Sequence, residues 1–134
     1  MNDRTKSAVR TLALGRLGIG IAALALPGVV GRAWIGSSGG GRGVKALVRA
    51  FGARDAVIAV GTLIALDDNR PVSHWLWFGA AVDAVDAAAT VLAFGNIPTR
   101  SLVSVAAMAG AGAATQIRLA QQAEAEIDAV PESV

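Results

Sequence analysis

The sequence predicts an all-α protein built as a four-transmembrane-helix bundle. Hydrophobic residues make up 54% of its 134 residues and charged residues only 16%, whereas soluble domains carry about 25% charged residues. Four long apolar runs recur along the chain, as in a multi-pass membrane protein, and they end at Leu26, Leu66, Phe94 and Leu119. The residues between 1 and 120 therefore form one predicted membrane domain.

The first predicted helix covers residues 9–30. Only residues 17–30 are free of charge, about 21 Å of helix, which is short of the ~30 Å hydrocarbon core. We therefore expect Arg16 to lie just inside the membrane edge and to extend toward the headgroups. A cleaved signal peptide is the alternative, because a basic leader precedes the apolar run and Ala23-Leu24-Ala25 resembles a cleavage site.

Residues 31–45 are rich in glycine and serine and predict a plain inter-helix loop. They lack the GKS or GKT of a phosphate-binding loop, and no strand precedes them. The second predicted helix covers 46–66, and its charge-free part spans only about 16 Å. Arg54 and Asp55 must then lie within the bilayer, with Arg49 near its edge.

The third predicted helix covers residues 73–95. It begins after Pro71, and we expect His74, Trp75 and Trp77 to lie at the membrane interface. Because His74 is the only histidine and is expected at the interface, a Ser/His/Asp catalytic set is implausible.

The fourth predicted helix covers residues 99–119. Its Ala106, Gly110 and Ala114 have the four-residue spacing of small residues that is typical of helix contacts. Residues 121–134 form an acidic, polar C-terminal tail that we expect to continue the helix and then fray.

Four crossings place both termini on one side of a cell membrane. The basic residues on the two sides are nearly equal in number, so the positive-inside rule orients the chain weakly. The basic leader favours cytoplasmic termini, and the near balance leaves dual topology open.

A buried polar cluster is the main candidate site. Asp83 and Asp86 are three residues apart and share one helix face, and Thr90 continues that face. A charged side chain at the bilayer centre costs roughly 2.5–3.5 kcal/mol, so these groups should face the bundle interior and find partners. Arg54 is the natural counter-charge, with Asp55 beside it, between the second and third helices.

Two interpretations of this cluster stay open. Intramembrane ion pairs can lock the second helix against the third without any ligand, or they can form a binding, proton or transport site. Asp83 and Asp86 alone are too few oxygen ligands for a divalent cation, and no metal or cofactor is expected. Cysteine is absent, which excludes thiolate chemistry. Scattered basic residues without tyrosine exclude a nucleic-acid surface.

With "FGARDAVIAVGTLIAL" in the second helix and "AVDAVDAAATVLA" in the third, the chain resembles small four-helix integral membrane proteins that are common in actinobacteria and whose function is unknown. The resemblance covers residue 9 to about residue 119. It implies a four-helix membrane fold and carries no established activity. The positions that it marks are Gly52, Arg54, Asp55, Asp83 and Asp86.

The function expected from these features is non-enzymatic. The chain would be an accessory protein or a binder of a small ligand or lipid headgroup, with the bilayer and a second copy or another membrane protein as partners. A small proton-coupled transporter acting as a homodimer is one alternative. The membrane acid of small multidrug exporters lies in their first helix, however, where this chain has Arg16. A membrane-embedded lipid-modifying enzyme is the other alternative.

Overall fold

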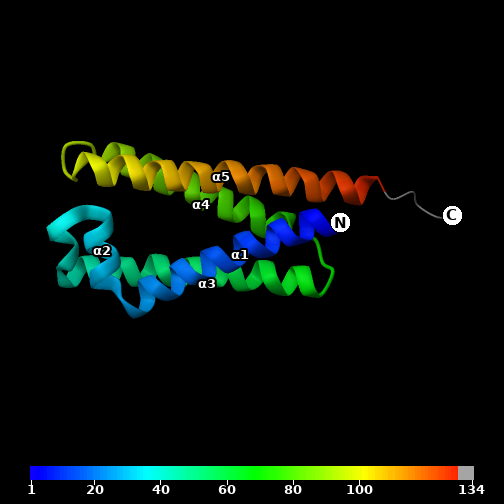
Figure 1. Cartoon of the computed structure of the whole chain (residues 1–134), viewed down its shortest axis with the longest axis horizontal. Coiled ribbons are helices and arrows are strands. Elements are labelled where there is room, and N and C mark those ends of the chain that lie inside the picture. Colours follow the sequence, from blue (N-terminus) through cyan, green and yellow to red (C-terminus); the bar gives the residue numbers. More distant parts are fainter. Residues whose placement is uncertain (130–134) are drawn as a thin grey trace.

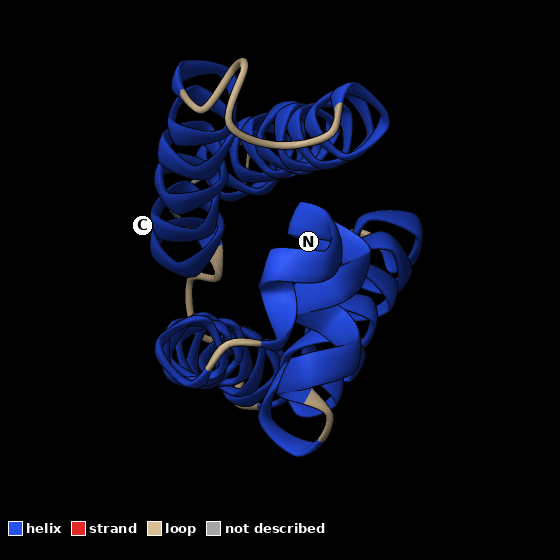
Figure 2. Cartoon of the chain, turned by 90° about the vertical axis from the view of Figure 1, so that its left-hand side faces the viewer, coloured by secondary structure: helices blue, strands red, loops and turns tan. Residues whose placement is uncertain are grey.

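A computed structural model describes residues 1–129, and these residues contain helices and no strand (Figures 1 and 2). The predicted all-α class is confirmed. The elements, in chain order, are α1 (Asp3–Ala25), α2 (Pro27–Ile35), the short 3-10 helix η1 (Gly36–Gly40), α3 (Arg42–Asp67), α4 (Ser73–Leu92) and α5 (Thr99–Asp128).

Three helices, α1, α4 and α5, are long and apolar enough to cross a membrane. The helix α3 is not among them and carries Arg49, Arg54 and Asp55 within its length. Length and composition therefore support a membrane protein.

The long helices lie along one axis and are arranged as two pairs (Figure 1). The helix α1 packs closely along α3, and α4 packs closely along α5, while contact between the pairs is more limited. The chain reverses at each connection, so the N-terminus lies beside the C-terminal part of α5 (Figure 1). The helix α2 and η1 lie at the opposite end.

The first predicted helix, 9–30, is in fact two helices. It begins earlier, at Asp3, where the side chain of Asn2 accepts a hydrogen bond from the backbone N–H of Thr5. It ends at Ala25, and α2 starts at Pro27. Proline lacks a backbone N–H and suits the first position of a helix, which explains why the chain breaks there.

The glycine-rich segment 31–45 was expected to be a plain loop, and this prediction is wrong. It contains the end of α2, all of η1 and the start of α3. Gly31 and Gly39 lie so close that a Cβ on either would clash with the backbone of the other. Glycine at both positions permits η1 to fold back against α2, so these two glycines serve close packing of the backbone.

The later helices also differ in their bounds. The helix α4 ends at Leu92, before Gly95, which has a φ of +84°. The helix α5 continues through the expected acidic tail to Asp128, because alanine, glutamine and glutamate are good helix formers. The part of that tail after residue 129 lies outside the described residues.

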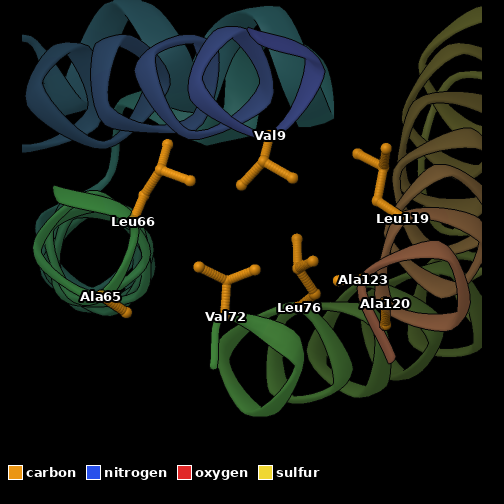
Figure 3. Close-up of a cluster of buried hydrophobic side chains, with 8 residues drawn as sticks. All are labelled: Val9, Ala65, Leu66, Val72, Leu76, Leu119, Ala120 and Ala123. Carbon is orange, nitrogen blue, oxygen red and sulfur yellow. The ribbon is translucent and has the colours of Figure 1, made fainter. Parts of the chain in front are cut away.

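A hydrophobic cluster fills the end of the bundle where α1 begins and α5 ends (Figure 3). The side chains come from all four long helices and from the turn before α4, and they are nearly inaccessible to solvent. Leu12 and Trp75 pack against the cluster. Its members are Val9, Ala65, Leu66, Val72, Leu76, Leu119, Ala120 and Ala123.

The helices α1 and α3 approach each other most closely at Gly20 and Gly52. A Cβ on Gly20 would lie 2.8 Å from the carbonyl oxygen of Gly52, and a Cβ on Gly52 would lie 2.7 Å from that of Gly20. Such contacts between small residues let helix backbones meet. The crossing lies about one helical turn from Arg16 and about half a turn from Arg54, and it holds α1 against the charged part of α3.

The small residues of α5 do not make the contact that their spacing predicts. A Cβ added to Gly110 would meet no atom within 4 Å, and Ala114 is exposed. The helix instead buries Ala113, Gln116 and Leu119. The repeat 106–110–114 therefore lies beside the packing face of α5.

Candidate functional site

A cavity of about 590 Å³ lies between the α1/α3 pair and the α4/α5 pair. Its volume falls within the roughly 300–1,000 Å³ that is typical of small-ligand sites. Most of its wall is apolar, with residues such as Ile19, Phe51, Val105 and Met108. Five charged side chains also line it: Arg16, Arg54, Asp55, Asp83 and Asp86.

These five side chains form an alternating series of acids and bases across three helices. In order of contact, the series is Asp83, Arg16, Asp55, Arg54 and Asp86. Asp55 is the central member, because its Oδ1 accepts hydrogen bonds from both arginines, each at 3.1 Å. We call this series the Arg/Asp chain.

Arg16 is the member that sequence reasoning placed elsewhere. Its side chain is only 10% exposed and donates to Asp55 Oδ1 and Asp83 Oδ2. The expectation that it extends to the lipid headgroups is therefore wrong. Arg16 lies one turn before the Gly20 crossing, on the side of α1 that faces α3, so its side chain enters the bundle.

Asp83 forms the inner end of the Arg/Asp chain. In addition to Arg16, the side-chain amide of Gln116 donates to its Oδ2 at 2.6 Å. Gly112 lies against the same carboxylate, since a Cβ there would be 2.6 Å from Oδ2. Gly79 leaves room for the side chain of Gln116. Asp83 is therefore both enclosed and well supplied with donors.

Asp86 forms the outer end, which is more open to the cavity. Arg54 contacts both of its oxygens, at 3.2 and 2.7 Å, in the two-point geometry that suits a guanidinium and a carboxylate. The side chains of Arg54 and Asp86 are 27% and 32% exposed. The guanidinium of Arg54 also lies 5.2 Å from the centre of the Phe51 ring.

Thr90 lines the cavity one turn beyond Asp86. Its hydroxyl donates to the backbone carbonyl of Asp86 at 2.7 Å. All five predicted site residues thus line one cavity. Arg54 was expected to pair with one of the two carboxylates, and it pairs with Asp86, whereas Asp83 is paired with Arg16.

Two residues of the site were missed. Arg16 interrupts an apolar run, and an intramembrane arginine is itself a signal for a buried site. Gln116 is the one amide side chain in the charge-free stretch 101–117. Within residues 1–129, every buried side-chain nitrogen and oxygen has a hydrogen-bond partner. No group of three or more His, Cys, Asp or Glu in the described part is placed to hold a metal ion.

A second polar contact joins the two ends of the chain outside the cavity. Glu126, beyond the apolar part of α5, accepts hydrogen bonds from the backbone N–H of Asn2, from the Asn2 side chain and from the Thr5 hydroxyl. The bond from the Asn2 backbone, followed by that from Thr5, holds the pKa of Glu126 below its ordinary range.

Comparison with known proteins gave no significant match to a protein family, a curated protein or a solved structure.

Proposed function

We propose that this chain is a multi-pass protein of the bacterial cell membrane whose cavity binds a small amphipathic molecule. All four long helices would cross the bilayer. The charges of α3 are compatible with this because Arg54 and Asp55 lie in the Arg/Asp chain inside the bundle. The outward side chains are apolar and exposed, as lipid-facing side chains are, and they include Leu14, Ile21, Val57, Ile64, Val85, Val91 and Val103.

The observation that carries the proposal is the cavity itself, which combines apolar walls with a group of charged side chains. A molecule with a polar head and an apolar chain matches both parts. Binding is favoured over catalysis because the charged side chains are paired with one another. A general acid or base would need to be free to exchange its proton with a substrate.

The cavity also has access from its sides. Ile19, Phe51 and Met108 line it and are 42%, 38% and 48% exposed. Ile19 belongs to α1, Met108 to α5 and Phe51 to α3. In a bilayer, these positions would open toward lipid, so an amphipathic molecule could enter without crossing water.

Binding can be tested with the protein in phosphatidylcholine nanodiscs. Decyl amphiphiles would be added, and the amount bound beyond that in empty nanodiscs would be measured by equilibrium dialysis. We expect saturable binding of one molecule per chain. Ala109→Phe would fill the cavity and abolish that binding, since Ala109 lines it.

The matched control is Ala107→Phe, on the same helix but at an exposed position that does not line the cavity. It should bind as the unchanged protein does. Equal binding by the two variants, or no saturable binding by the unchanged protein, would refute the proposal.

Transport is a second candidate, and the position of the hydrophobic cluster favours it. Leu12 lines the cavity and also packs against that cluster, so the cavity is closed toward the termini. A site closed toward one end is one state of an alternating-access cycle. Flux of a bound amphiphile into proteoliposomes would separate a transporter from a binding protein.

Assembly and orientation are further proposals. The start of α1 and the end of α5 lie at one end of the bundle, so both would be on one side of the membrane, with the cytoplasm favoured by the basic leader. A second copy or another membrane protein could cover the exposed apolar faces. We also propose that the chain is related to the small four-helix membrane proteins of actinobacteria.

A further inference from the structure

The charges around the cavity are not balanced. Three carboxylates, those of Asp55, Asp83 and Asp86, face two guanidinium groups, those of Arg16 and Arg54. Three against two leaves one surplus negative charge when all five are ionised. No other charged residue lines the cavity among the residues that the structure describes.

We propose that the cavity selects a lipophilic monocation, with its charged head against Asp86 and its chain along the apolar wall. This inference rests on the proposed function and adds the charge of the ligand. A monocation brings the sum of charges at the Arg/Asp chain to zero. A neutral molecule leaves one surplus charge, and an anion raises it to two, in surroundings where unbalanced charge is costly.

Asp86 is the member that is free to receive the cation. Asp83 is occupied by Arg16 and Gln116, with Gly112 against it, and Asp55 lies between two arginines. Among the residues that the structure describes, Asp86 has Arg54 as its only charged partner. A carboxylate offers about four lone-pair positions, so the two bonds from Arg54 leave others for a ligand in the cavity that Asp86 lines.

The apolar wall continues from Asp86 in one direction. Thr90, Ala93 and Ile97 follow Asp86 toward the end of the bundle where α2 lies, and all three line the cavity. Trp34 and Ile35 of α2 line the same end. From residue 86 to residue 93 the helix rises about 10 Å, which accommodates an alkyl chain of moderate length.

The test compares three probes that share a decyl chain and carry a fixed charge: decyltrimethylammonium, decanol and decyl sulfate. Binding to the unchanged protein is measured in phosphatidylcholine nanodiscs, with partition into empty nanodiscs subtracted. Because this lipid has no net charge, the bilayer itself adds little preference. We expect decyltrimethylammonium to bind at least tenfold more tightly than decanol, and decyl sulfate to bind most weakly.

Two variants change the surplus charge in opposite directions. Asp86→Asn removes it and should weaken decyltrimethylammonium binding at least tenfold, so that the preference for this cation over decanol is lost. Arg54→Gln increases it and should strengthen binding of the same cation. Asp68→Asn, on the exposed turn after α3, makes the same change of net charge away from the cavity and should alter nothing.

Different failures have different meanings. Saturable binding of all three probes with equal affinity, or tightest binding of decyl sulfate, would overturn the cation preference and leave the amphiphile site standing. If none of the probes shows saturable binding, the proposed function itself fails. If Asp86→Asn does not fold, the order of the probes on the unchanged protein still decides the question.

Discussion

Arg16 of α1 and Asp83 of α4 form an ion pair between the two helix pairs of the bundle. Arg54 and Asp86 form a second such pair between α3 and α4. Contact between the helix pairs is otherwise limited. The Arg/Asp chain therefore connects two halves between which a cavity remains, and it holds them in register while leaving that space open.

Replacing Arg16 should strongly destabilise the protein. Arg16→Leu leaves Asp55 and Asp83 buried with three carboxylates facing one arginine. Breaking a buried ion pair by removing one partner costs about 3–5 kcal/mol. The free energy of unfolding, measured by reversible unfolding in mixed micelles, should fall by an amount of that order.

Arg10→Leu is the control for Arg16→Leu, because it breaks the pair with Asp67, in which both side chains are at least half exposed. Exposed pairs contribute about 0–1 kcal/mol. Equal losses in the two variants would show that the Arg/Asp chain does not hold the bundle together.

Adding a methyl group at the helix crossing should be unfavourable. In Gly20→Ala, the new Cβ would lie 2.8 Å from the carbonyl oxygen of Gly52 and 2.9 Å from the backbone nitrogen of Ala56. Neither backbone atom can move without separating α1 from α3. Overpacking of this kind costs about 1–3 kcal/mol, which should appear as a lower melting temperature in detergent.

The same glycine-to-alanine change at Gly18, two residues earlier, should not lower the melting temperature. A Cβ at Gly18 meets no atom within 4 Å, and alanine is better than glycine within a helix by roughly 0.5–1 kcal/mol. Gly18→Ala should therefore be neutral or slightly stabilising. A loss of stability there as large as for Gly20→Ala would contradict the close crossing.

Loss of the Gln116 amide should weaken the inner end of the Arg/Asp chain. Gln116→Leu removes a donor to Asp83, and hydrogen bonds to charged groups contribute about 1.5–3 kcal/mol. Gln116 is almost fully buried, so water cannot easily replace the amide. The exposed variant Gln121→Leu serves as the comparison, and a similar free energy of unfolding for both would exclude this role.

The contact of the N-terminus with Glu126 should depend on pH. The pKa of Glu126 is lowered in the folded chain, first by the hydrogen bond from the Asn2 backbone and then by that from Thr5. A lowered pKa means that the stabilisation is fully present above the ordinary pKa of glutamate. It is lost as the pH falls through the lowered value, where the carboxylate becomes protonated.

The difference in melting temperature between the unchanged protein and Glu126→Gln should therefore be positive at neutral pH and vanish in acid. Asp128→Asn, on the same exposed end of α5, should show no such dependence. A difference that stays constant with pH would separate Glu126 from the docking of the N-terminus.

Composition and the pattern of apolar runs were enough to predict an all-helical chain with membrane-length segments. They also predicted a buried polar cluster, because a charge inside an apolar run is costly in a membrane. The predicted members that these runs contain are Arg54, Asp55, Asp83 and Asp86. These inferences depend on local properties of the chain, which the order of residues contains directly.

Which charges meet could not be read from that order. The direction in which Arg16 points depends on the rotation of α1 against α3, and that rotation is set by the contact of Gly20 with Gly52. The break at Leu26 also shortens α1 and carries α2 across the far end of the bundle. The pairing of the charged side chains and the cavity beside them both result from packing between segments that are distant in sequence. They are therefore properties of the folded chain alone.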